Sequence, residues 1–166
     1  MSIKNNKRIL TIIIGIFLLL SLVGCSLTGN DEAQITQIAK NIEEAIKEKD
    51  VDLFMESISY DYSDTDGGTY DNHINNLPEE IFSKIEENED LVDFWGIFNI
   101  KPKVTIPESD LVLADIYASG KMTIEIILEG CIAWVICPDL YNETTNYNVD
   151  FIKKDDDWKI ISLIET

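Results

Sequence analysis

The spacing of apolar residues changes once along this chain, near Leu91, and this change restricts the fold more than any other feature. Before it, apolar residues recur at the three- and four-residue intervals of amphipathic helices. After it, apolar and polar residues alternate with the two-residue period of strands. Helices followed by strands predict an α+β domain, in which N-terminal helices pack across a curved antiparallel sheet and enclose a pocket.

Three helical segments are expected in the first half. Asp31 is positioned to cap the first helix, with Gln34 completing a capping box. Asp50 caps a second, shorter helix, and Pro78 opens a third, because proline is favoured in a first helical turn. The stripe of the first helix consists of Ile35, Ile38, Ala39, Ile42 and Ile46.

Four to six antiparallel strands are expected after Leu91. Leu111–Ala118 fits a short helix nearly as well as a strand, and the polar run Lys153–Asp157 is expected as a hairpin turn. The first strand should end near Pro102 or Pro107. The strand segments are Phe94–Phe98, Thr123–Leu128, Cys131–Cys137, Tyr147–Phe151 and Trp158–Leu163.

The segment Cys131–Cys137 is apolar on both alternating faces, which predicts a central strand covered on both sides. Along a continuous strand its two cysteines would lie about 20 Å apart at ~3.3 Å per residue. A disulfide needs Cα atoms only about 5.5 Å apart. We therefore expect two buried free thiols, although a disulfide could form if the chain is exported from the cytoplasm.

The charge balance excludes one class of function. Thirteen basic and 31 acidic residues among 166 give a net charge of −18, which would repel the phosphates of a nucleic acid. At 45% hydrophobic residues the chain can still form one globular domain. Three cysteines and one histidine are too few for a multi-ligand zinc site, so neither a metal nor a cofactor is expected.

The N-terminus has the pattern of a secretory signal. Three basic residues precede fifteen uncharged residues, Ile9–Val23, which are followed by Gly24 and Cys25. The segment Leu22–Cys25 resembles the bacterial lipobox, in which signal peptidase cuts before a lipid-modified cysteine. A retained membrane anchor is the alternative, but a span usually needs about 20 apolar residues. A signal cut without lipidation is a further alternative.

The lipobox divides the chain into three parts. They are a signal peptide (1–24), a lipidated Cys25 with a short linker (25–30) and a single domain (31–166). Removing the signal takes away three basic residues and no acids, which leaves a net charge of −21. Because bacterial membranes are anionic, acyl chains on Cys25 must hold the domain at the membrane. We expect a lipoprotein on the extracytoplasmic face of the cell membrane.

The mature domain resembles the cone-shaped superfamily of nuclear transport factor 2, scytalone dehydratase and ketosteroid isomerase. It is most similar to the small secreted lipoproteins of that superfamily. The resemblance rests on the acidic first helix, on SYDYSDTDGG at 59–68, and on the closing pattern of Val149–Ile152 and Asp157–Ile160. It implies a cone with a pocket on the inner face of the sheet.

The acidic segment 61–66 has two interpretations. Its Asp and Gly residues are typical of a turn, beneath which Tyr60 or Tyr62 would pack. A weak cation site is the alternative, since hard cations bind clustered oxygens. The EF-hand template fails, because it would place Tyr62 and His73 at positions that require carboxylates. We expect a turn.

The candidate pocket residues are Tyr62, His73, Trp95, Trp134 and Tyr147. The resemblance allows acid–base chemistry by a set such as His73 with Asp64 or Asp71, but a single histidine at a helix start is more often solvated. We expect no catalytic residue and a module that binds a small molecule or a protein partner. The alternatives are an enzyme of the dehydratase or isomerase type, and an assembly module that docks to another envelope protein.

Overall fold

The computed structural model describes residues 27–65, 67–72, 74–92, 98–131 and 136–166. The chain forms two compact units, Met1–Ala33 and Gln34–Thr166, and the second contains the whole sheet. Its helical elements are α2 (Leu27–Glu48), which begins in the first unit, α3 (Val51–Glu56), η1 (Ile74–Asn76), α4 (Leu77–Val92) and η3 (Glu108–Asp110). Its strands are β1 (Phe98–Thr105), β2 (Val112–Ala114), β3 (Tyr117–Gly130), β4 (Asp139–Lys154) and β5 (Asp157–Glu165).

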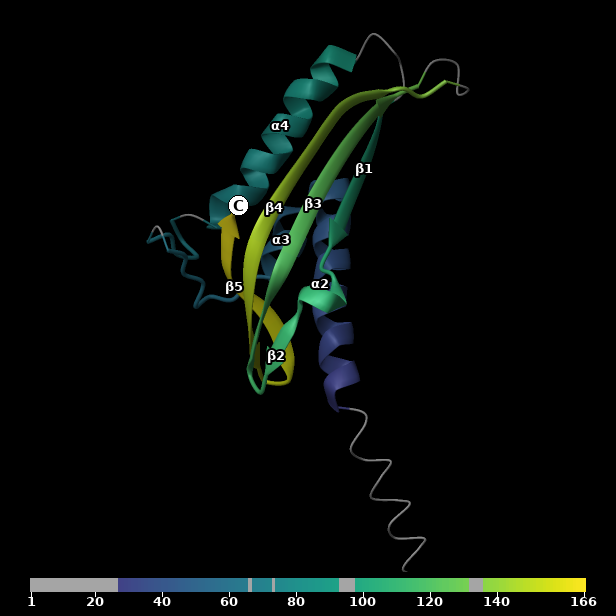
Figure 1. The fold of residues 1–166 in the computed structure, drawn as a ribbon. Coiled ribbons are helices and arrows are strands. Elements are labelled where there is room, and N and C mark those ends of the chain that lie inside the picture. The colour runs from purple at the N-terminus through teal and green to yellow at the C-terminus, as the bar shows by residue number, and fades with distance from the viewer. Residues whose placement is uncertain (1–26, 66, 73, 93–97, 132–135) are drawn as a thin grey trace, which may run out of the picture. The chain divides into compact units, whose positions relative to one another are not determined.

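The strands form one antiparallel sheet in the order β1-β3-β4-β5, with β2 paired to β3 beyond the end of β1 (Figure 1). The long β3–β4 ladder runs from the pair Tyr117–Ile152 to the pair Glu129–Asp139. The helices of the second unit pack against this curved sheet, which confirms the predicted α+β class. The strand run follows the helical run, as the change in apolar spacing predicts.

The core forms where the helical stripe meets the inner face of the sheet. Ile35, Ile42 and Ile46 of α2 are fully buried, which confirms the predicted stripe. Along β3 every second side chain is buried from Met122 to Leu128, as the two-residue period predicts. These apolar side chains fill the space between the layers, together with Phe54, Phe151, Trp158 and Ile160.

The predicted helix and turn signals hold at three places and fail at one. The Asp50 carboxylate accepts a hydrogen bond from Leu53 N at 3.0 Å and caps α3. Pro78 is the second residue of α4. Asp155 and Asp156 form the β4–β5 turn with positive φ angles. Asp31, however, lies inside α2 rather than at its cap, because the helix already begins at Leu27.

The first strand ends close to Pro107, one of the two ends expected, while residues 94–97 of the predicted strand Phe94–Phe98 lie outside the described residues. β1 continues through Pro102 to Thr105 because it is an edge strand, where a missing N–H can face away from the sheet. Two residues on, Val104 N points to the same outer side and donates to the Glu43 carboxylate of α2 at 3.0 Å. Val112–Ala114 is a strand, which settles the helix-or-strand ambiguity there.

The cysteine prediction was wrong. Cys131 and Cys137 form a disulfide, with Cα atoms 4.1 Å apart. β3 ends at Gly130, just before Cys131, and β4 starts at Asp139, soon after Cys137, in the opposite direction; residues 132–135 of the expected central strand lie outside the described residues. The two cysteines therefore face each other across the β3–β4 connection instead of lying along one strand.

We predict that Cys131 and Cys137 resist thiol labelling in the denatured protein until a reductant is added. Peptide mass spectrometry would report both states. Replacing both residues by serine should lower the free energy of unfolding by about 2 kcal/mol, because the bridge closes a short loop in the unfolded chain. Labelling of both cysteines without reductant would contradict the bridge.

Candidate functional site

The segment after α3 runs along the outer edge of β5 and is held there by backbone hydrogen bonds. Ser59 N donates to Ile160 O at 2.8 Å, and Ile160 N donates to Ser57 O at 2.9 Å. Farther along, Ser63 N donates to Ile161 O at 2.9 Å. This pairing covers the edge of the sheet and fixes the residues between Ser57 and Ser63 relative to β5.

Tyr62 is the buried aromatic residue of this segment, with 3% of its surface exposed. Its hydroxyl donates to Leu163 O and accepts from Leu163 N, both at 3.2 Å. Burial raises the pKa of the Tyr62 phenol above its usual value of 10, and the nearby Asp64 raises this pKa further. Tyr60, in contrast, is 84% exposed.

Asp64 shapes the acidic turn. Its carboxylate accepts a hydrogen bond from Gly68 N at 2.7 Å, and its backbone N–H donates to Gly68 O at 3.1 Å. Gly67 adopts a positive φ of 82°, which favours glycine. The segment therefore has the predicted turn, with Tyr62 packed beneath it.

A pocket of about 290 Å³ opens beside Tyr62. The acidic turn, the start of α4, β4 and the end of β5 each contribute to its walls. Apolar side chains, tyrosines and carboxylates line it, and no basic side chain is among the described lining residues. They are Tyr62, Asp64, Thr65, Ile74, Leu77, Glu80, Tyr147, Leu163, Ile164 and Glu165.

Tyr147 enters this pocket from β4, where it is paired with Glu165 of β5. Burial raises the pKa of Tyr147 to about 12, and the negative charges of Glu165, Glu143 and Glu80 add to the shift. The phenol therefore keeps its proton at neutral pH and can donate a hydrogen bond, but it is a poor base.

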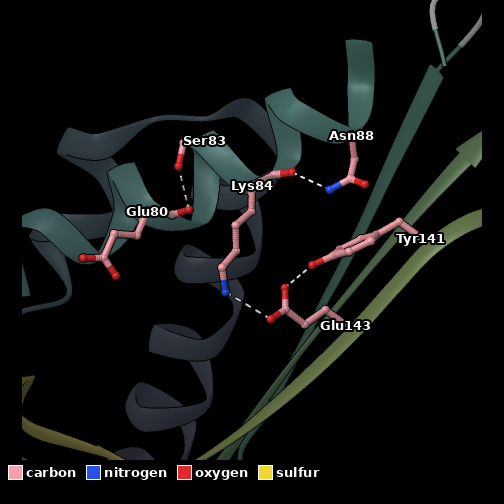
Figure 2. Close-up of polar contacts among 6 residues, drawn as sticks. All are labelled: Glu80, Ser83, Lys84, Asn88, Tyr141 and Glu143. Atoms are coloured by element: carbon pink, nitrogen blue, oxygen red, sulfur yellow. Dashed lines mark hydrogen bonds and ion pairs between the residues drawn. The ribbon is translucent and has the colours of Figure 1, made fainter. Parts of the chain in front are cut away.

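A polar network joins α4 to β4 next to the pocket (Figure 2). Lys84 Nζ lies 3.1 Å from the Glu143 carboxylate, to which the Tyr141 hydroxyl also donates a hydrogen bond. The bond from Tyr141, together with Lys84, lowers the pKa of Glu143. Burial raises the pKa of Tyr141 to about 12, and both the hydrogen bond to Glu143 and the negative charge of Glu143 add to this shift. This network fixes the helical turn that follows the pocket residue Glu80.

Two of the five predicted pocket residues, Tyr62 and Tyr147, lie together in the pocket wall. His73, Trp95 and Trp134 lie outside the described residues, as does Cys25. Sequence reasoning missed the pocket residues Glu80 and Glu165. Pairing the residues of β4 and β5 one by one from their turn would have placed the neighbour of Glu165, Ile164, opposite Tyr147. A bulge between Asp150 and Phe151 shifts this register by one residue, so that Glu165 is the partner.

Two further observations concern the described part of the chain. Within it, no His, Cys, Asp and Glu residues form a group of three or more that could hold a metal ion. In that same part, every helix is too short or too polar to cross a membrane.

Comparison with known proteins adds the fold class. Neither a family model nor a curated protein matches the sequence. One similar solved structure is a nuclear transport factor 2 (NTF2-like) superfamily protein from Salmonella enterica serovar Typhimurium, which is 10% identical in sequence and has a TM-score of 0.53. The match covers 84% of this chain and 92% of that protein. A putative scytalone dehydratase from Novosphingobium aromaticivorans is 13% identical, with a TM-score of 0.51 and coverages of 84% and 89%. The chain therefore has an NTF2-like fold, and at these identities the likeness does not extend to activity.

We predict that Tyr62→Phe lowers the free energy of unfolding by about 1–3 kcal/mol, because it leaves the buried N–H and C=O of Leu163 without their partner. Urea denaturation followed by circular dichroism measures the change. Tyr60→Phe is the matched control, and it should change stability by less than about 0.5 kcal/mol because Tyr60 is exposed. Equal losses in both variants would contradict the role assigned to Tyr62.

Proposed function

We propose that this chain is a non-catalytic binding module, anchored by lipid on the extracytoplasmic face of the cell membrane, which takes a small molecule into the pocket between Tyr62 and Tyr147. The observation that carries the binding function is the composition of the pocket wall. Apolar side chains and two tyrosines surround a space large enough for a small organic molecule, and the carboxylates of the wall come from three separate elements.

The two phenols of the wall favour binding over catalysis. General acid–base catalysis is most effective when the pKa of the group lies near the working pH. The pKa of Tyr147 is about 12, and that of Tyr62 is also raised, so both phenols act as hydrogen-bond donors at neutral pH. The similarity to a putative scytalone dehydratase supports the fold of the binding module and supplies no reacting group.

We predict that the pocket binds small fragments and that filling it abolishes this binding. Saturation-transfer NMR would be run with a fragment set that contains equal numbers of cationic, neutral and anionic members. Leu77→Trp places an indole in the pocket and should remove the hits. Leu140→Trp is the control, since Leu140 lies outside the pocket lining and is 40% exposed. A fragment set without hits, or hits unchanged by Leu77→Trp, would contradict a ligand pocket at this place.

The anchoring part of the proposal rests on the sequence alone. The basic N-terminus, the uncharged run Ile9–Val23 and the Gly24-Cys25 pair have the order and lengths of a lipoprotein signal. A thioether-linked diacylglyceryl group, with or without a further acyl chain on the new N-terminus, provides the two or more chains that stable anchoring requires.

We predict that cells fed labelled palmitate incorporate label into this protein and that Cys25→Ala removes it. Ser26→Ala is a suitable control, because it changes a neighbouring residue and leaves the thiol in place. When the membranes of the same cells are fractionated, the Cys25→Ala protein should be missing from the lipid-modified pool. Equal labelling of wild type and Cys25→Ala would refute lipid attachment at this residue.

A further inference from the structure

We propose that the ligand of this pocket is an organic cation, a protonated amine carried on an apolar body. The inference rests on the proposed binding function and names the ligand class. It follows from the way charge and apolar surface are distributed over the wall: three elements contribute one carboxylate each, and the remaining wall is mostly apolar or phenolic.

The three carboxylates are Asp64 in the acidic turn, Glu80 in the first turns of α4 and Glu165 at the end of β5. None of the described lining residues carries a positive charge to balance them. Lys84 lies one turn after Glu80 in α4. It forms an ion pair with Glu143 of β4 and is not among the lining residues of the pocket (Figure 2). A ligand that brings its own positive charge would interact favourably with this negatively charged wall.

The charged groups that act on Tyr147 are negative. Glu165, Glu143 and Glu80 all disfavour the phenolate of Tyr147, and they act on it from two different elements besides its own strand. The same potential that disfavours an anion at this position favours a cation there. An anionic ligand would meet this field without any basic partner among the described lining residues.

The spacing of the carboxylates favours an organic cation over a metal ion. They do not form a group compact enough to ligate a metal. The pocket volume of about 290 Å³ instead suits a molecule of roughly a dozen heavy atoms. Its apolar part would contact Ile74, Leu77 and Leu163, and its ammonium group would lie toward the carboxylates.

The test compares three probes of nearly equal shape and different charge: tryptamine, which is cationic, 3-ethylindole, which is neutral, and indole-3-propionate, which is anionic. Isothermal titration calorimetry would use the full chain in a non-ionic detergent at pH 7.5, with titrations into detergent alone subtracted. We expect tryptamine to bind at least about 3-fold more tightly than 3-ethylindole, and indole-3-propionate to bind most weakly.

Two variants assign the preference to the pocket. Glu80→Gln and Glu165→Gln should each weaken tryptamine binding about 2- to 5-fold, the range for solvent-accessible charge pairs, and leave 3-ethylindole binding unchanged. Glu79→Gln is the matched control, because it removes the same charge from the preceding residue of α4, which does not line the pocket. It should change tryptamine binding less than about 2-fold.

The outcomes separate this inference from the binding function. Equal affinity for the three probes, or equal effects of Glu79→Gln and Glu80→Gln, would overturn the cation preference and leave the pocket as a binding site. The same holds if tryptamine fails to bind while other fragments give hits that Leu77→Trp abolishes. A fragment set without any such hit would overturn both the binding function and the cation preference.

Discussion

The pairing of the segment Ser57–Ser63 with the outer edge of β5 is the interaction on which the candidate site depends. It covers an exposed sheet edge with backbone hydrogen bonds and places the Tyr62 hydroxyl on both polar groups of Leu163. Because Tyr62 is fixed in this way, the acidic turn that follows it projects beside the end of β5. Without this pairing, Asp64 and Glu165 would have no reason to share a pocket wall.

The coarse fold could be predicted because it depends on local spacing. An amphipathic helix and an alternating strand each carry their period in neighbouring residues, so the α2 stripe and the buried side of β3 were predictable. The disulfide was not, because the apolar run from Cys131 to Cys137 has the composition of a buried strand and gives no sign that the chain reverses there. A reversal is set by the pairing of β3 with β4, which is a non-local property.

The site was predictable only in part, for a related reason. Tyr62 and Tyr147 could be singled out from their positions in a turn and on an alternating strand, with the cone fold as a guide. Glu80 and Glu165 could not, since 85 residues separate them in a sequence with 31 acidic residues, where any single carboxylate is most simply taken as a solvated charge. What distinguishes these two is the convergence of α4 and β5, fixed in part by the contact of Lys84 with Glu143.

The excess of acidic residues has two separate consequences for the proposed ligand. Spread over the whole domain, it raises the local concentration of any cation and so acts on the rate of association. That long-range effect is screened within about 8 Å at physiological salt and discriminates little between one cation and another. Discrimination between cations must therefore arise inside the pocket. There, apolar side chains and protonated phenols lie beside the carboxylates and limit the shape of the cation that fits. Small inorganic cations share the first effect but cannot use the second, because they have no apolar body to bury.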